Sequence, residues 1–222
     1  MAMKRLLSIL PVAFFCTPLL ADGWSIGVGT GPFVFGKYVE RKLPIITPGG
    51  GIQGTSTISL SAATRAGVSV DLQRDLTPAL ALGLDVAYAK APLAAKIRSN
   101  NAEISSDDGD LAITTVALPL VWRINRSGAF RFHMGAGPAY AIYHRRQFVT
   151  LTPNNYTRER FGAMGEAGVA WQWTPRFAVE GNVSDVVTSS PFERSDFGAA
   201  QSGLSIPRPH NVHTTVGLRY RF

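Results

Sequence analysis

Apolar and polar residues alternate along most of the chain with a period of two, which is the pattern of a β-strand with one apolar face. The clearest case is the stretch 211–222. Its even positions, from Val212 to Phe222, are apolar or hydroxylated, whereas its odd positions include Arg219 and Arg221. A tilted strand crosses a bilayer with about 9–11 residues, so this stretch is long enough. Because an arginine on the lipid face costs about 2–4 kcal/mol at mid-membrane, we expect the apolar face to meet lipid and the arginines to point inward.

The same alternation recurs along the rest of the chain. The predicted strands are 24–36, 57–73, 79–90, 111–124, 129–143, 159–173, 177–189 and 211–222. Short turns rich in Pro, Gly, Asn and Asp alternate strictly with the longer loops 37–56, 91–110, 144–158 and 190–210. This order predicts an all-β fold, an eight-stranded antiparallel up-and-down transmembrane β-barrel with four long external loops and three short periplasmic turns. An even number of strands places both ends of the barrel on the periplasmic side.

Aromatic residues fall near the ends of the predicted strands. Those near the predicted periplasmic ends are Trp24, Trp122, Phe130, Trp171, Trp173, Phe177, Tyr220 and Phe222. Those toward the outer ends are Tyr88, Tyr140 and Phe161. Two aromatic belts are typical of proteins that cross a membrane, because amphipathic rings prefer its interfaces. A soluble β-sandwich would explain one alternating strand, but it would not explain the belts.

The N-terminus predicts export. Lys4 and Arg5 precede the apolar run 6–20, and Ala21 is a plausible last residue before cleavage. We therefore expect a signal peptide over 1–21 and the barrel over 22–222. The single cysteine, Cys16, lies in the predicted signal peptide, so we expect no disulfide in the barrel.

Composition narrows the choice of partners. Only 17% of the 222 residues are charged, which does not suit an ordinary cytosolic surface. The net charge of +7 comes from dispersed residues without a nucleic-acid-binding motif, so we expect anionic lipid headgroups as partners and no nucleic acid.

Several motifs together resemble a known family. They are the signal peptide, the glycine-rich strand 132–140, the Trp-Gln-Trp-Thr-Pro-Arg-Phe pattern at 171–177 and the final Tyr220-Arg221-Phe222. The chain resembles the small eight-stranded outer-membrane barrels of the OmpA/OmpW type, within the outer membrane protein β-barrel family. The resemblance implies a monomer in the bacterial outer membrane, with Tyr220 and Phe222 as the signal for the barrel assembly machinery. In the OmpW branch it would also imply a lateral apolar route through the wall, for which inward-pointing Phe33 and Phe35 are the only hint.

The predicted interior carries charges of both signs. In the register above, the inward charged residues are Asp71, Asp85, Glu166, Glu180, Arg65, Arg123, Arg131, Arg160, Arg219 and Arg221. Buried charges must be paired or hydrated, and we expect Arg131 or Arg219 to bridge Glu166 and Glu180. A salt-bridged core that pins the barrel and an ion or proton relay both remain open. The narrow interior of an eight-stranded barrel favours the first.

Two further sites are considered in the outer part of the barrel. Basic residues expected to contact lipopolysaccharide phosphates are Lys37, Arg41, Lys42, Arg145, Arg146 and Arg158. A lipid A deacylase or acyltransferase would need a Ser–His pair with an acid, and the nearby candidates are Ser189, Ser190, Asp196, His210 and His213. No deacylase signature accompanies them, so we assign no catalytic residue.

The four histidines are too scattered for a metal site, and no cofactor motif appears. The sequence thus favours a structural or interaction protein with a closed or narrow interior and no enzymatic activity. Passage of small hydrophobic solutes through a narrow channel or the wall is the first alternative, and a lipid A-modifying enzyme is the second.

Overall fold

The structure is a computed structural model, and it describes residues 23–46, 50, 52–99, 102–124, 128–146, 155–197 and 203–222. The predicted signal peptide lies outside these residues. The strands are β1 (Trp24–Val34), β2 (Lys37–Ile46), β3 (Ile52–Ala62), β4 (Arg65–Thr77), β5 (Leu80–Ser99), β6 (Ala102–Ala117), β7 (Leu120–Arg123), β8 (Phe130–Arg146), β9 (Tyr156–Gln172), β10 (Phe177–Thr188), β11 (Leu204–Ser205) and β12 (His210–Arg221). A short 3-10 helix, η2 (Arg194–Phe197), precedes β11. Among the described residues, no helix is both long and apolar enough to span a membrane.

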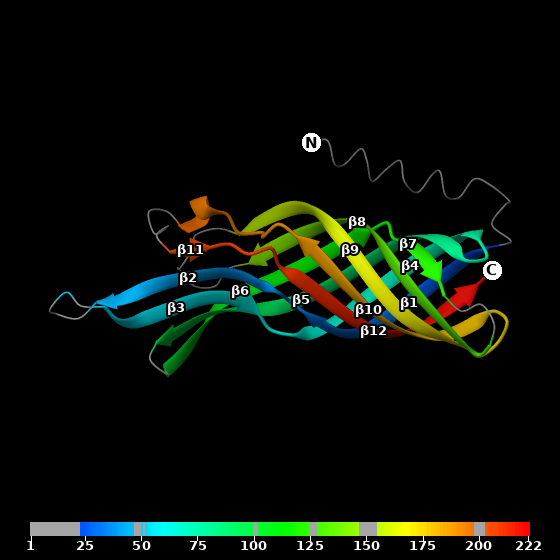
Figure 1. The fold of residues 1–222 in the computed structure, drawn as a ribbon, viewed down its shortest axis with the longest axis horizontal. Helices are drawn as coiled ribbons and strands as arrows, with labels where there is room; N and C mark the ends of the chain where they lie inside the picture. The colour runs from blue at the N-terminus through cyan, green and yellow to red at the C-terminus, as the bar shows by residue number, and fades with distance from the viewer. Residues whose placement is uncertain are drawn as a thin grey trace.

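The described strands close into an antiparallel ring (Figure 1). Going around the wall, β1 pairs with β4, β4 with β5, β8 with β9, β9 with β10, β10 with β12, and β12 with β1. Between β5 and β8, the wall position is shared by β6 and β7, which are two parts of one strand interrupted at Leu118 and Pro119. The ring therefore has eight wall positions, and the predicted up-and-down barrel is confirmed.

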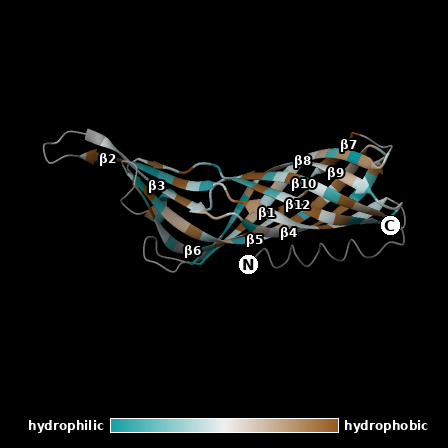
Figure 2. Ribbon diagram, turned by 90° about the horizontal axis from the view of Figure 1, so that it is seen from below, coloured by the Kyte–Doolittle hydropathy of each residue, from teal (hydrophilic) through white to brown (hydrophobic). Residues whose placement is uncertain are grey.

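The exterior of the ring is apolar, as the alternation predicts. Val216 on β12 is 64% exposed and Leu82 on β5 is 46% exposed, so both point away from the barrel interior. Along the ring, hydrophobic positions alternate with hydrophilic ones (Figure 2). The rings of Trp122, Trp171 and Trp173 are also exposed. This surface suits a hydrocarbon environment, where a closed barrel leaves no strand edge unpaired.

Two predicted loops are strands instead. The expected loop 37–56 contains β2 and the first part of β3, and the expected loop 91–110 contains the outer part of β5 and most of β6. The segments β2, β3 and β6 extend away from the end of the barrel at which the C-terminus lies (Figure 1). These loop predictions are wrong because outside the membrane the exterior of a sheet meets water. Polar residues then occupy the exterior face, and a strand looks like a polar loop in the sequence.

The predicted strand 57–73 does not keep one register. The chain breaks strand structure at Ala63 and Thr64, between β3 and β4. Leu60 is buried before the break, whereas Val68, at a position of the same parity, is more than half exposed after it. The interruption therefore exchanges the inward and outward faces, which period-two counting cannot detect.

Glycine at the closing seam permits the close approach of β1 and β12. A Cβ at Gly217 would overlap the carbonyl oxygen of Val28 and lie 2.7 Å from the Cα of Gly29. We expect Gly217→Ala to lower the free energy of unfolding by about 1–3 kcal/mol, because overpacking forces backbone shifts. Gly165→Ala is the matched control, since a Cβ there meets nothing within 4 Å. Urea titration in detergent, followed by tryptophan fluorescence, measures both. Equal losses in the two variants would contradict the role of the seam glycine.

Candidate functional site in the barrel interior

Arg219 cross-links three strands inside the ring. Its Nε donates to Glu180 Oε1 on β10 at 2.5 Å, its Nη2 to Asp71 Oδ1 on β4 at 2.5 Å, and its Nη1 to Ser25 Oγ on β1 at 3.1 Å. Gly27 lies between Arg219 and Asp71 in the same cross-strand row. A Cβ at Gly27 would come within 3.2 Å of Arg219 Nη2, so the missing side chain lets the guanidinium reach Asp71. We refer to Arg219, Glu180, Asp71 and Ser25 as the Arg219 crossbar.

A second ion-pair group lies nearer the end of the barrel at which the C-terminus lies. Asp75 accepts from Arg123 Nη2 at 2.6 Å and from Arg221 Nη2 at 2.7 Å. Asp75 is absent from the inward charged residues predicted from the sequence, so this role was missed. The signal was present, because Asp75 continues the odd-numbered inward positions occupied by Asp71 and Gln73.

The middle of the interior holds carboxylates outside the crossbar. Asp85 lies directly opposite Asp71 in the β4–β5 pair. Neither Asp85 nor Glu166 forms an ion pair with a described residue. A polar cavity of about 20 Å³ touches Asp71, Asp85 and Glu166, which is room for about one water molecule. The expected arginine bridge thus reaches Glu180 but not Glu166.

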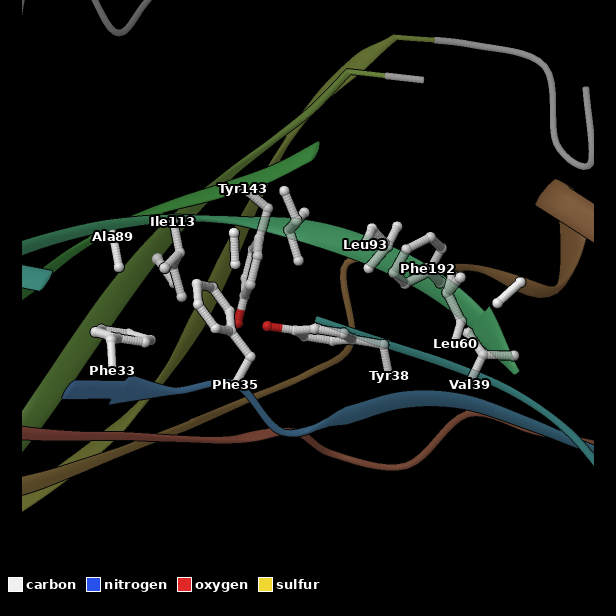
Figure 3. Close-up of a cluster of buried hydrophobic side chains, with 14 of the residues drawn as sticks. Phe33, Phe35, Tyr38, Val39, Leu60, Ala89, Leu93, Ile113, Tyr143 and Phe192 are labelled. Carbon is white, nitrogen blue, oxygen red and sulfur yellow. The ribbon is translucent and has the colours of Figure 1, made fainter. Parts of the chain in front are cut away.

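The outer half of the interior is filled by an apolar cluster. Its buried members are Phe33, Phe35, Tyr38, Val39, Leu60, Ala89, Ala91, Leu93, Ala95, Leu111, Ile113, Ala141, Tyr143, Phe192 and Leu204. Figure 3 shows the rings of Phe33, Phe35, Tyr38 and Tyr143 gathered between opposite sides of the wall. Tyr38 and Tyr143 have no exposed surface, and their rings meet edge to face at 6.2 Å between centroids. The inward positions expected for Phe33 and Phe35 are those observed.

A chain of hydrogen bonds runs through this cluster. Tyr38 Oη donates to Asn211 Oδ1 at 3.0 Å, and Asn211 Nδ2 donates to Tyr143 Oη at 3.0 Å. Tyr143 Oη also lies 2.7 Å from Thr188 Oγ1. Buried polar groups in proteins are nearly always paired, and here the pairing links β2, β12, β8 and β10. Sequence reasoning missed Tyr38 because it lay in a predicted loop.

The segment 189–197, which we call the plug segment, covers the outer mouth. Its Phe192 is 2% exposed, with its ring 5.9 Å from that of Tyr38 and 6.1 Å from that of Tyr156. Ser190 Oγ donates to the carbonyl oxygen of Tyr38 at 3.2 Å. Arg158 on β9 holds Asp196 with two bonds of 2.5 and 2.6 Å, and it donates to Pro191 O at 2.6 Å. The plug segment thus inserts the phenyl ring of Phe192 into the interior of the barrel.

The basic residues expected at lipid headgroups divide into two groups. Lys37, Lys42 and Arg146 are exposed, and both lysines lie within 4 Å of Glu40. Arg41 is half-buried. Arg145 is only 3% exposed and packs on the ring of Phe192.

Arg145 and Arg158 therefore face the interior, and the headgroup expectation is wrong for these two residues. Inward positions continue along β8 and β9 beyond the predicted strand ends, which turns both arginines away from the surface. Arg160 also points inward, toward Glu193 at 2.7 Å, whereas Arg65 is exposed at the break before β4.

Acid is expected to release the plug segment. Burial alone would raise the pKa of Asp196, but hydrogen bonds from Arg158 and from the Glu193 backbone hold it below its ordinary value. The stabilisation by this pair is complete above the unfolded-state aspartate pKa of about 3.9, and it is lost as the pH falls through the lower folded-state pKa. A fluorophore attached through Ser195→Cys should then lose anisotropy in acid. In Asp196→Asn the anisotropy should already be low and insensitive to pH, and an unchanged acid transition in that variant would contradict the assignment.

The candidate hydrolase residues are not brought together. His210 Nδ1 lies 2.7 Å from Asp185 Oδ2, whereas the ring of buried His213 lies 5.2 Å from that of Phe33. Ser190 bonds the Tyr38 backbone, and Asp196 bonds Arg158. Within the described part of the chain, no serine hydroxyl is hydrogen-bonded to a histidine ring, and no group of His, Cys, Asp and Glu is placed to hold a metal ion.

Solved structures share this architecture. The outer membrane protein OprG from Pseudomonas aeruginosa matches with a TM-score of 0.61 and 12% identity, over 91% of this chain and 96% of that chain. The chain has the fold of the small outer-membrane β-barrel proteins. Two other barrels illustrate the range of matches. The outer membrane protease OmpT from Escherichia coli matches with a TM-score of 0.50 and 12% identity, over 90% of this chain and 97% of that chain.

Outer membrane protein W from E. coli matches with a TM-score of 0.44 and 18% identity, over 91% of this chain and 99% of that chain. No protein-family model matches the chain, and no curated protein matches it. At these identities the likeness concerns the fold alone, so the role of this barrel must be argued from its own residues.

Proposed function

We propose that this chain is a barrel protein of the bacterial outer membrane whose interior is closed to solutes. Its role is structural or interaction-based, and it is exerted through its outer surface and its external strands. The belt of exposed apolar side chains supports the membrane location, because a large exposed apolar surface is unfavourable in water.

The observation that carries the proposal is the filling of the interior at two levels. The Arg219 crossbar spans the inner half, and the apolar cluster with Phe192 fills the outer half. A conducting barrel needs a continuous hydrated path, and an interior of this size is readily filled by side chains. Asp85 and Glu166 lie between the crossbar and the apolar cluster. Their position there favours local hydration of the two carboxyl groups and not the transport of solutes through the barrel.

Planar-bilayer recording tests closure. We expect the refolded full chain to give no discrete conductance steps in molar KCl, as for a sealed barrel. Reproducible single-channel openings would overturn the closed interior. Charge removal by Glu166→Gln should leave the absence of conductance unchanged, because a carboxylate between two closed levels carries no current.

A second candidate, passage of small hydrophobic solutes, is favoured by one observation. The apolar cluster lies beside interruptions of the wall strands at residues 35–36 and 63–64. Nuclear Overhauser contacts between an added apolar probe and the methyl groups of Leu93 or Ile113 would support this route. Contacts restricted to exterior methyl groups such as those of Val216 would indicate partitioning into detergent alone.

The exposed surface of the barrel supports two kinds of partner, lipopolysaccharide and the barrel assembly machinery. Exposed Lys37 and Lys42 support contact with lipopolysaccharide phosphates above the bilayer. The ring of Phe222 is half-exposed beside that of Tyr220, at 5.1 Å between centroids. This exposure at the end of the closing strand β12 supports recognition by the barrel assembly machinery. Deleting Phe222 should lower the yield of folded barrel in cells more than it lowers refolding in detergent.

A further inference from the structure

A cavity of about 60 Å³ lies at the periplasmic end of the barrel, on the inner side of the Arg219 crossbar. Among the described residues that line it are five arginines, Arg123, Arg131, Arg176, Arg219 and Arg221. Of the residues that the structure describes, two carboxylates, Asp75 and Glu180, line it as well. Positive charge therefore exceeds negative charge around this cavity.

The ion pairs described above do not use all of these arginines. Arg123 and Arg221 share the single carboxylate of Asp75, and Arg219 engages Glu180. Arg131 and Arg176 form no ion pair with any residue that the structure describes. The site thus has two guanidinium groups available for an external anion.

Buried polar atoms point to the same conclusion. Arg131 Nε is buried and has no hydrogen-bond partner among the described residues. The imidazole of His133, which also lines the cavity, is 8% exposed. Buried donors without a partner are rare in proteins and indicate a bound water or ion. Guanidinium groups in particular match the geometry of phosphate and carboxylate oxygens.

The dimensions and the position of the cavity limit the kinds of ligand that it can bind. A volume of this size holds about four water molecules, which is comparable with the four oxygens of a tetrahedral oxyanion. The side chain of Arg221 is 48% exposed, and Arg176 lies in the exposed turn between β9 and β10, so the rim faces the periplasm. The crossbar separates the cavity from the outer half of the barrel.

We propose that this cavity binds a phosphate group presented from the periplasm, with Arg131 and Arg176 as its principal ligands. Arg123 and Arg221 add positive potential, while Asp75 keeps them in place. The binding is reversible and involves no covalent step. The site serves free phosphate or a small phosphomonoester, because the cavity has no room for a larger group beyond its rim.

Phosphate titration of the full-length barrel in detergent tests the proposal. Phosphorus NMR or calorimetry should detect saturable binding of inorganic phosphate at constant ionic strength set with chloride. Arg131→Gln should weaken binding at least tenfold. The control Arg74→Gln should leave it unchanged, since Arg74 is exposed, packs over the ring of Trp24 and does not line the cavity.

Two further arms complete the design. Arg176→Gln changes an exposed turn residue and should weaken binding even if Arg131→Gln folds poorly. A parallel titration with glycerol 3-phosphate distinguishes free phosphate from a phosphomonoester, according to which binds more tightly. A response that follows ionic strength alone, or equal binding by Arg176→Gln and Arg74→Gln, would overturn the proposal.

Discussion

Replacing Arg219 by glutamine is expected to lower the free energy of unfolding by about 3–5 kcal/mol. The wild-type guanidinium pairs with Glu180 and Asp71 inside the barrel, where few other groups can solvate them. Its removal leaves two carboxylates without their cation, close to Asp85 directly opposite Asp71. Three carboxyl groups would then share one poorly hydrated region without a cation, which is more costly than the loss of three hydrogen bonds.

Urea titration of the refolded barrel in detergent measures this loss, with Arg74→Gln as the control for an exposed arginine. Combining Arg219→Met with Glu180→Gln and Asp71→Asn should recover much of the stability, because the uncompensated charges are removed as well. A loss below about 1 kcal/mol, the size typical of an exposed ion pair, would show that the crossbar is effectively solvated.

Replacing Phe192 by alanine is expected to cost about 3–5 kcal/mol, provided that the plug segment unfolds together with the barrel. The ring packs against Tyr38, Tyr156 and Phe197 and lies under the guanidinium of Arg145. Its loss leaves a cavity that this rigid wall cannot fill. Phe192→Leu keeps most of the apolar volume and should cost less than about 1.5 kcal/mol.

The same variant separates stability from closure. Hydrogen exchange of the plug segment should accelerate in Phe192→Ala, whereas planar bilayers should still show no conductance because the Arg219 crossbar remains. Unchanged exchange and stability would contradict the role of Phe192 as a plug. Channel openings in this variant alone would show that the outer half provides the only seal.

Prediction from the sequence was most successful where the environment of the strands allows only one arrangement. Inside a bilayer, every backbone polar group must be paired and the exterior must be apolar. The alternation around Leu82 and Val216 therefore predicted both the strands and their outward faces. The same reasoning failed over 37–56 and 91–110. Strands that face lipid carry apolar residues on their exterior face, whereas strands that face water carry polar residues there and therefore resemble loops in the sequence.

The site was less accessible to such reasoning. Period-two counting placed Arg219, Asp71 and Glu180 inside, but it could not choose their partners. That choice depends on strand register, which places Gly27 between Arg219 and Asp71 and leaves Glu166 without an arginine. Phe192 could not be assigned at all, because its position depends on bonds from Arg158 to a segment more than 30 residues away.

The sequence by itself determined the sidedness of the wall, the closed up-and-down order of its strands and the charged character of its interior. These properties follow from local alternation, because lipid and lumen impose opposite polarity on neighbouring residues. Only the tertiary structure decided which charges meet, which residue fills the outer mouth and where two arginines remain without carboxylates. These features depend on the stagger between strands and on the path of a returning segment, and neither is encoded in the order of apolar and polar positions.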